Sequence, residues 1–414
     1  MDGLRRCSRC VTPETHETIF FDNEGVCNVC RQYEHKQEQI DWDARRGELE
    51  KIFDQYRGQN DYDCLVPFSG GKDSTFTLHT LVKDFGMKPL VISFDHGFYR
   101  PTVQESKLRT YRKLGVDVLQ FTPNWKVVKK LMLESLKRKG DFCWHCHSGI
   151  FAYPMHVAVK YKVPLVIWGE PSAEYTSYYS YDDGIESVDE ERFNRFVNLG
   201  ITAEDMLGML DGEVTMRDLN PYTYPKLKDL KAINYRSFCL GSYLPWDVKK
   251  QSWIIKKELG WQEEEVEGVP PGYGYEKIEC MFQGVRDYLK FIKRGYARVS
   301  HLASIDIRNG RLSREAALEY VKQYEGKRPA SLDVFLEYLE LTEAQFNEIA
   351  VSQIVYPNEC DPALLERGRE NWDQKLWYRE RQKASVLKET FATGPAAEKT
   401  GMEKPNVRKI SGGD

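Results

Sequence analysis

The chain carries a glycine-rich hexapeptide whose residue types can bind phosphate groups, Ser69-Gly70-Gly71-Lys72-Asp73-Ser74. Adjacent glycines let the backbone turn with its N–H groups facing outward, and Lys72 adds a positive charge. The hydroxyl groups of Ser69 and Ser74 can donate to phosphoryl oxygens. Because Asp73 follows Gly71-Lys72, the segment does not match a Walker A loop, in which Ser or Thr follows that lysine. We expect a phosphate site of another type here.

Four cysteines near the N-terminus form two C-x-x-C pairs, Cys7 with Cys10 and Cys27 with Cys30. Their spacing is typical of a four-cysteine zinc site. Four thiolates fill a tetrahedral shell and leave no open position, so we expect Zn²⁺ with a structural role. A segment this small has little core of its own, and zinc binding would supply much of its folding free energy.

The elements that position the phosphate loop are short apolar runs alternating with helical patterns from residue 61 onward. Runs at 64–68, 90–94, 116–121 and 163–168 have the composition of buried strands. Strands that alternate with helices predict an α/β fold with a doubly wound parallel sheet, which binds ligands outside the carboxyl ends of its strands. The loop follows the first of these runs and precedes a helix, whose dipole would favour an anion.

The string SGGKDS resembles the pyrophosphate loop of the ATP pyrophosphatases, which cleave ATP between its α- and β-phosphates and adenylate an oxygen atom. The resemblance implies an adenine-nucleotide alpha-hydrolase-like fold with ATP bound at residues 69–74. It also implies an adenine and ribose site at the end of the second predicted strand, at Phe94, Asp95 and His96.

The same resemblance places Gly169 and Glu170, after the fourth predicted strand, near the phosphates. Glu170 is a candidate ligand for a Mg²⁺ ion that bridges the pyrophosphate, although an acid at a strand end can equally cap a helix. Lys72, Asp73 and Glu170 are the expected catalytic residues. Asp73 would either bind Mg²⁺ or hold Lys72 in place.

A second cysteine group consists of Cys143 and Cys146, in the segment CWHCH, together with the distant Cys239. Some pyrophosphate-loop enzymes that thiolate tRNA hold an iron–sulfur cluster with a comparable arrangement. Three thiolates would leave one iron open, whereas zinc would take His145 or His147 as a fourth ligand. The same side chains could also line a cleft without a metal, and the sequence leaves these alternatives open.

Length and composition bound the remaining possibilities. The 414 residues include 59 basic and 63 acidic side chains, for a net charge of −4, which argues against a protein that mainly binds nucleic acid or an anionic membrane. No apolar run approaches the ~20 residues of a membrane span, and no secretory signal is evident, so we expect a cytoplasmic protein.

The patterns divide the chain into five expected parts. These are a zinc-ribbon-like module at 1–35, a linking helix at 36–60, the pyrophosphate-loop ATP-binding α/β domain at 61–250 with an insertion at about 171–220, a helical region at 251–390 and a disordered tail at 391–414. Within the helical region, residues 272–276 (Gly-Tyr-Gly-Tyr-Glu) have the composition of a binding turn.

Taken together, the C-x-x-C pairs, SGGKDS, CWHCH, the segments GEPSAEY and YLPWD, and the region near Asp306-Ile-Arg308 resemble the N-acetyl sugar amidotransferase family of bacterial surface-polysaccharide biosynthesis. The resemblance implies an AMP-forming enzyme that adenylates the acetamido oxygen of an N-acetyl sugar, such as a UDP-linked diacetamido-uronic acid. Ammonia then displaces AMP and gives an acetamidino sugar for lipopolysaccharide O-antigen.

The sequence offers no source for that ammonia. Position 2 is Asp2 rather than a nucleophilic cysteine, and no G-x-C-x-G elbow surrounds any of the ten cysteines. The family resemblance implies two partners, a glutaminase subunit and a cyclase-like barrel subunit, which resemble imidazole-glycerol-phosphate synthase.

Two other functions remain open. A tRNA sulfurtransferase would share the loop and the three-cysteine group, and a local run of basic residues between 126 and 139 is compatible with tRNA, although the mild overall acidity makes nucleic acid an unexpected partner. A zinc-ribbon scaffold without catalysis would leave the intact SGGKDS loop without a purpose.

Overall fold

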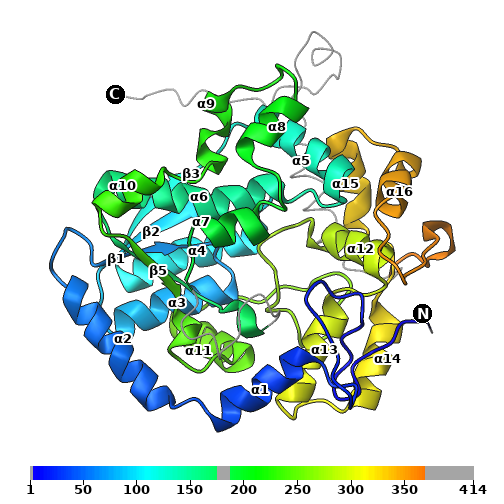
Figure 1. The fold of residues 1–414 in the computed structure, drawn as a ribbon, viewed down its shortest axis with the longest axis horizontal. Coiled ribbons are helices and arrows are strands. Elements are labelled where there is room, and N and C mark those ends of the chain that lie inside the picture. The colour runs from blue at the N-terminus through cyan, green and yellow to red at the C-terminus, as the bar shows by residue number, and fades with distance from the viewer. Residues whose placement is uncertain (1–2, 175–186, 369–414) are drawn as a thin grey trace, which may run out of the picture.

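The computed structural model describes residues 3–174 and 187–368, and a five-stranded parallel sheet lies at its centre (Figure 1). The strand order is β3-β2-β1-β4-β5. The strands are β1 (Cys64–Pro67), β2 (Pro89–Phe94), β3 (Asp117–Phe121), β4 (Leu165–Trp168) and β5 (Arg236–Cys239). The order reverses at β1, so the carboxyl ends of β1 and β4 flank the switch point where such sheets bind ligands. The predicted doubly wound parallel sheet is confirmed.

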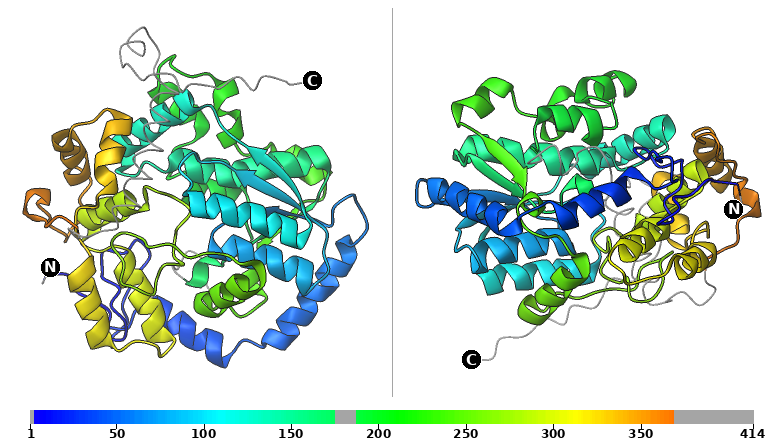
Figure 2. Two further views of the ribbon diagram at one scale, coloured as in Figure 1. Left: turned by 180° about the vertical axis from the view of Figure 1, so that it is seen from behind. Right: turned by 60° about the horizontal axis from the view of Figure 1, so that its bottom comes forward.

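Alternate side chains of the strands face two apolar layers. Val66 of β1 packs with Leu78 of α3 (Lys72–Lys83) and Val103 of α4 (Pro101–Leu114), in a cluster that also includes α2 (Trp42–Tyr56) and α11 (Val248–Leu259). Its neighbour Leu65 packs on the other face against Ala152 of α6 (Trp144–Tyr161). Strands buried on both faces explain why the runs are continuously apolar. Figure 2 shows helices on both sides of the sheet.

The strand β5 was not predicted. It is only four residues long and begins with Arg236, so it lacks the apolar run that identified the other four. Its pairing with β4 aligns Leu165 with Arg236 and Trp168 with Cys239. Tertiary contact with β4, rather than local composition, therefore determines this strand.

Helices make up most of residues 281–368, the part of the expected helical region after residue 280 that the structure describes. They are α12 (Gln283–Arg294), α13 (Arg298–Arg308), α14 (Arg314–Tyr324), α15 (Ser331–Leu339) and α16 (Glu343–Val351), followed by the short η6 (Pro362–Leu364). Between α11 and α12 the irregular segment 260–282 returns to the sheet, where the Met281 N–H donates to the Phe98 carbonyl (2.9 Å). This return brings residues 276–280 to the phosphate loop.

The other elements are short or lie at the periphery. They are α1 (Asn28–Glu38), α5 (Trp125–Lys139), η1 (Ser172–Glu174), α7 (Glu190–Arg192), η3 (Phe193–Val197), α8 (Ala203–Met209), α9 (Met216–Leu219), η4 (Asn220–Tyr222), α10 (Leu227–Ala232) and η5 (Leu240–Ser242). Part of the expected insertion, at 175–186, and the expected tail at 391–414 lie outside the described residues. Within the described ranges, every helix is too short or too polar to cross a bilayer.

Candidate functional site

The glycine-rich loop joins the carboxyl end of β1 to the start of α3. Gly71 is the N-cap of that helix, and Gly70 has a φ of +83°, in the left-handed region. A Cβ atom at Gly70 would lie 2.5 Å from Lys107 Cγ, so only glycine fits there. The backbone N–H groups of Ser69 and Gly70 both donate to the Ser74 hydroxyl, at 3.3 and 3.2 Å. The loop is thus wound around Ser74 at the positive end of α3.

Lys72 lies at the centre of a buried charge network, with 2% of its surface exposed. Its Nζ is 2.8 Å from Asp73 Oδ2 and 2.7 Å from Glu276 Oε2. Burial disfavours the ammonium charge, but Asp73, Glu276 and Glu170 outweigh burial and raise the pKa of Lys72 well above its usual value. Lys72 is therefore held as a cation directly beside the loop.

Two carboxylate oxygens beside this lysine have no hydrogen-bond partner among the described residues. They are Asp73 Oδ1 and Glu170 Oε1, and both are buried. Burial and the neighbouring Asp73 raise the pKa of Glu170 well above its ordinary value. Paired, unsatisfied carboxylates are the ligands that a hard divalent cation prefers, so the residues present fit Mg²⁺.

Both acids line a cavity of about 190 Å³ at the carboxyl ends of β1, β2 and β4. Its polar side includes Ser69, Ser74 and Lys277, and its apolar side includes Phe94, Ile150, Phe151 and Pro154. Phe151 stacks on Trp168, with 4.5 Å between ring centroids. A cavity lined by both charged and apolar side chains is suited to a ligand that has phosphate groups and an aromatic base.

The structure brings together most of the residues that the sequence suggested for nucleotide binding. Phe94, Gly169 and Glu170 line the cavity with the loop. Gly169 is needed for close approach, since a Cβ there would lie 2.8 Å from Thr77 Oγ1. Asp95 and His96 are not among the lining residues. Asp95 Oδ1 instead accepts from the Gly97 N–H (2.9 Å), and the His96 Nδ1 accepts from the Phe98 N–H (3.2 Å).

Three charged residues of the site were missed: Glu276, Lys277 and Glu279. Glu276 is 3% exposed, and Lys277 and Glu279 line the cavity. A Cβ at Gly71 would lie 3.0 Å from Glu279 Oε2, so this carboxylate lies directly over the loop. The available signal was the turn-like composition of residues 272–276, but nothing in the sequence relates that turn to a loop two hundred residues earlier.

Glu276 gives a test of the buried network. Burial opposes its charge, but Lys72 and Lys277 outweigh burial and lower its pKa to about 2. We expect Glu276→Gln to reduce the free energy of unfolding at pH 7 by about 3 kcal/mol, because it removes one partner of a buried ion pair. Since the folded-state pKa is depressed, the stabilisation is complete above the ordinary value of 4.5 and is lost as pH falls toward 2.

Urea unfolding at a series of pH values measures this effect. Glu258→Gln is the matched control, because the Glu258 side chain pairs with His79 but is 51% exposed. The control should change stability by less than ~1 kcal/mol. Equal effects of the two variants at pH 7 would contradict the importance of the buried pair.

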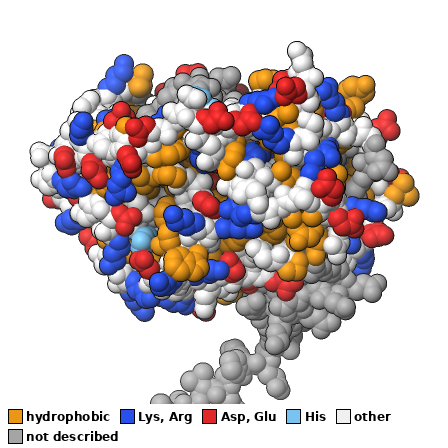
Figure 3. Space-filling model, turned by 90° about the horizontal axis from the view of Figure 1, so that it is seen from below, with side chains coloured by type: hydrophobic (Ala, Val, Ile, Leu, Met, Phe, Trp, Pro, Cys, Tyr) orange, Lys and Arg blue, Asp and Glu red, His pale blue; other side chains and the backbone are white. Residues whose placement is uncertain are grey.

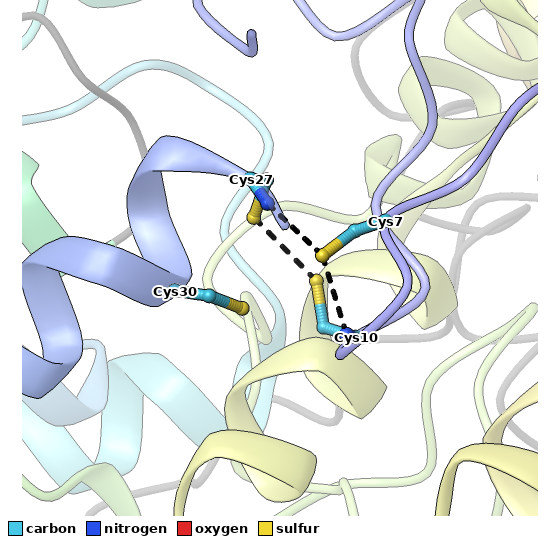
Figure 4. A group of neighbouring side chains, drawn as sticks. All are labelled: Cys7, Cys10, Cys27 and Cys30. Carbon is cyan, nitrogen blue, oxygen red and sulfur yellow. Dashed lines mark hydrogen bonds between the residues drawn. The ribbon is translucent and has the colours of Figure 1, made fainter. Parts of the chain in front are cut away.

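The predicted four-cysteine site is assembled in the structure (Figure 4). The four sulfur atoms all lie within 4.8 Å of one another, and all four residues are buried. Cys10 Sγ is 3.7 Å from Cys27 Sγ, and Cys7 Sγ accepts from the backbone N–H groups of Cys10 (3.4 Å) and Cys27 (3.2 Å). The all-thiol donor set and its burial fit a structural Zn²⁺ ion.

This cysteine module rests on the C-terminal helices. The Arg314 side chain donates to the carbonyls of Cys7 and Cys10, and the Thr12 hydroxyl donates to Ser304 Oγ (3.1 Å). In both views of Figure 2 the N-terminal segment lies against α13 and α14. Lys36 of α1 pairs with Glu174, which follows β4. The module therefore connects the helical region to the sheet.

The second predicted cysteine group is not assembled as expected. Cys239 ends β5 and belongs to an apolar cluster with Ala152 and Met155, where its sulfur accepts from Arg192 Nη1 (3.8 Å). Cys143 and Cys146 instead pack with α5 and α12 in a different cluster. Within residues 3–174 and 187–368, only the N-terminal four cysteines form a tight metal-ligand group. Strand β5 places Cys239 beside β4, in a different apolar cluster from Cys143 and Cys146, so the second metal site stays a prediction.

Comparison with known families gives a match for the helical part of the chain. Residues 272–361 match the family described as LPS biosynthesis protein WbpG-like, C-terminal domain. The predicted relation to proteins of surface-polysaccharide biosynthesis is confirmed for this part. The matched range includes Glu276, Lys277 and Glu279, so this domain contributes directly to the cavity over the loop.

Two relatives match other stretches. The chain is 25% identical over 166 residues to an uncharacterized protein of Methanocaldococcus jannaschii, which covers 40% of this chain and 58% of that protein. It is 32% identical over 69 residues to the glutamine-hydrolyzing GMP synthase of Pyrobaculum aerophilum, which covers 17% of this chain and 14% of that enzyme. The chain therefore spans less than two thirds of the length of either relative.

Two solved structures resemble this one. The U34-tRNA thiolase NcsA from Methanococcus maripaludis with its 4Fe-4S cluster has a TM-score of 0.31 and 14% identity, and the match covers 77% of this chain and 89% of that chain. The NMN synthetase from Francisella tularensis has a TM-score of 0.27 and 15% identity, with 47% and 92% covered. Neither similarity assigns a substrate or a cofactor to this chain.

Proposed function

We propose that this protein is an ATP-dependent, AMP-forming amidotransferase that converts the acetamido group of an N-acetyl sugar into an acetamidino group for lipopolysaccharide O-antigen. The observation that carries the proposal is a buried lysine at the end of a glycine-rich loop, together with two unsatisfied carboxylate oxygens whose residues line a cavity at the carboxyl ends of β1, β2 and β4. The match of residues 272–361 to lipopolysaccharide biosynthesis proteins supports the substrate class.

The chemistry requires activation of a poor electrophile. The acetamido oxygen attacks the α-phosphorus of ATP, and the bond to the β-phosphate oxygen breaks to release pyrophosphate. Ammonia then adds to the imidate carbon, AMP departs with the oxygen, and loss of a proton leaves the amidine. Adenylation thus turns the amide oxygen into part of a good leaving group, which is why ATP is consumed.

The loop residues would stabilise charge on the departing pyrophosphate. Lys72 would supply a fixed positive charge. The backbone N–H groups of Gly70 and Gly71, which here donate to the Ser74 and Ser69 hydroxyls, would donate to phosphate oxygens when ATP is bound. Asp73 and Glu170 would hold Mg²⁺, which neutralises phosphate charge when bound. The apolar side of the cavity, with Phe94 and Phe151, would bind adenine. Zn²⁺ at the four-cysteine site would act only on structure.

We also propose that ammonia comes from a glutaminase partner together with a cyclase-like barrel subunit. The purified chain should therefore form the amidino product with ammonium but not with glutamine. Mass spectrometry of UDP-linked acetamido sugars incubated with ATP, Mg²⁺ and either nitrogen source measures this, because replacement of O by NH lowers the mass. Efficient glutamine use by the pure chain would contradict the partner proposal, and release of ADP instead of AMP would contradict the enzyme class.

The tRNA sulfurtransferase alternative makes a different prediction, namely tight, salt-dependent tRNA binding. The basic residues of α5 are partly neutralised: Lys129 pairs with Glu340 (2.9 Å), and Lys130 pairs with Glu213 (3.0 Å). On the face drawn in Figure 3, basic and acidic side chains are interspersed. Filter binding with tRNA at physiological salt separates the two functions, and thiolation would raise rather than lower the mass of the product.

A further inference from the structure

A second lysine, Lys277, borders the nucleotide cavity together with the carboxylates of Asp73, Glu170 and Glu279. Among the described residues, it is the only lysine or arginine in the lining of this cavity. It also has no hydrogen bond and no ion pair with any residue of the ranges 3–174 and 187–368. A lysine that borders a cavity without such a partner can offer its ammonium group to an anionic ligand.

The loop lysine, Lys72, differs from Lys277 in this respect. Its Nζ contacts both Asp73 Oδ2 (2.8 Å) and Glu276 Oε2 (2.7 Å), so two negative charges surround one positive charge. This group of three is therefore not positive as a whole. A bound triphosphate carries several negative charges, and Lys277 is the cation at the cavity whose charge is not already taken up by a direct contact.

The backbone at Lys277 is left-handed, with a φ of +52°. A residue with a Cβ atom adopts this conformation only at a cost in energy, and residues of this kind cluster at functional sites. The conformation separates two adjacent side chains, because Glu276 contacts Lys72 whereas Lys277 borders the cavity. The strained backbone thus accompanies the placement of a lysine beside the space for a ligand.

The residues on both sides hold Lys277 in this conformation. Arg298 Nη1, on α13, donates to the Glu276 carbonyl (2.8 Å), and the Nε of the same guanidinium donates to Asp287 Oδ2 (2.7 Å). On the other side, Ile278 is fully buried in the apolar cluster to which α3 also contributes. The segment that carries Lys277 is therefore fixed before any ligand binds, and such preorganisation is what stabilisation of developing charge requires.

We propose that Lys277 is a catalytic residue that binds the phosphate chain of ATP. When the acceptor oxygen bonds to the α-phosphorus, the bond from that phosphorus to the bridging oxygen breaks, and its electron pair stays on pyrophosphate. Lys277 keeps its proton and donates hydrogen bonds to the phosphate oxygens as this charge develops. The assignment rests on the proposed function for the use of ATP, but not for the identity of the acceptor.

Isothermal titration calorimetry of the full chain with Mg²⁺ and α,β-methylene-ATP, in which carbon replaces the bridging oxygen, tests the proposal. Lys277→Met should bind this analogue about 10- to 100-fold more weakly than wild type, the loss expected for one hydrogen bond to a charged group. Adenosine, which has no phosphate, should bind both proteins equally. Lys322→Met is the matched control, because Lys322 is exposed on α14, and it should leave binding unchanged. AMP formation by Lys277→Met should fall by about 10²-fold or more.

Lys277→Gly provides a second variant should Lys277→Met fail to fold, because glycine adopts a left-handed backbone without strain. Unchanged analogue binding and AMP formation in both variants would overturn the proposal. An equal loss of adenosine binding would also overturn it, because that result would show a distorted cavity rather than a lost phosphate contact. The acceptor is tested separately: weaker analogue binding by Lys277→Met, together with no amidino product from wild type, would support the role of Lys277 and contradict the proposed sugar substrate.

Discussion

Replacement of Lys72 by methionine should reduce the rate of AMP formation by about 10²- to 10³-fold, the loss expected when one preorganised group that stabilises transition-state charge is removed. Methionine keeps much of the aliphatic volume of lysine but carries no charge. The effect should fall on kcat more than on KM for ATP, because the charge of the departing pyrophosphate develops in the transition state. Release of pyrophosphate and AMP in steady-state assays measures both parameters.

This substitution also leaves a buried acid without its partner. Glu276 would remain ionised beside the introduced methionine unless it took up a proton, at a cost of about 3–5 kcal/mol in stability. The double variant Lys72→Met/Glu276→Gln removes both charges and separates the two effects. It should recover most of the stability and none of the rate. Lys83→Met, in the exposed last turn of the same helix, is the matched control. Full activity in the double variant would remove Lys72 from the mechanism.

Removal of zinc from the four-cysteine site should also have a large effect, in this case on folding. The free energy of zinc binding to four thiolates is about 10–16 kcal/mol in small zinc domains, so its loss should unfold residues 3–35. The effect should extend to α13 and α14, because Arg314 and Ser304 contact the cysteine module directly. Hydrogen–deuterium exchange after chelation, or in Cys27→Ser, should show faster exchange in both regions.

Cys360→Ser is the control for this experiment, because Cys360 is only partly buried and packs against a different cluster. It should retain full zinc content by elemental analysis. Unchanged hydrogen–deuterium exchange of α13 and α14 in the metal-free protein would show that the cysteine module does not stabilise these two helices.

Sequence reasoning identified those parts of the molecule that local residue patterns determine. Val66 and its neighbours make β1 buried on both faces, and Gly70 with Gly71 marks the turn that follows. The two C-x-x-C pairs needed only their spacing. In each case a short stretch contains both the composition and the geometry that the prediction required.

The features that sequence reasoning missed depend on contacts between distant segments. Glu276 contacts Lys72 only because the segment after α11 turns back over the sheet. No local sequence pattern predicts that path of the chain. The same return places Cys280 beside Tyr99 and in the apolar cluster that also includes Cys143 and Cys146. Strand β5 was missed because pairing with β4 compensates for its weak composition. Candidate residues were thus recognised by type, but their partners required the fold.

The contacts between Arg314 and the carbonyl of Cys7 join residues 307 positions apart in the chain. A ribosome must therefore add about three hundred residues after Cys7 before the cysteine module can contact Arg314. Such separation slows the search for native contacts and lengthens the time during which the nascent thiols are open to oxidation. Early capture of zinc would protect those thiols during synthesis, so metal supply at translation should govern the yield of mature protein.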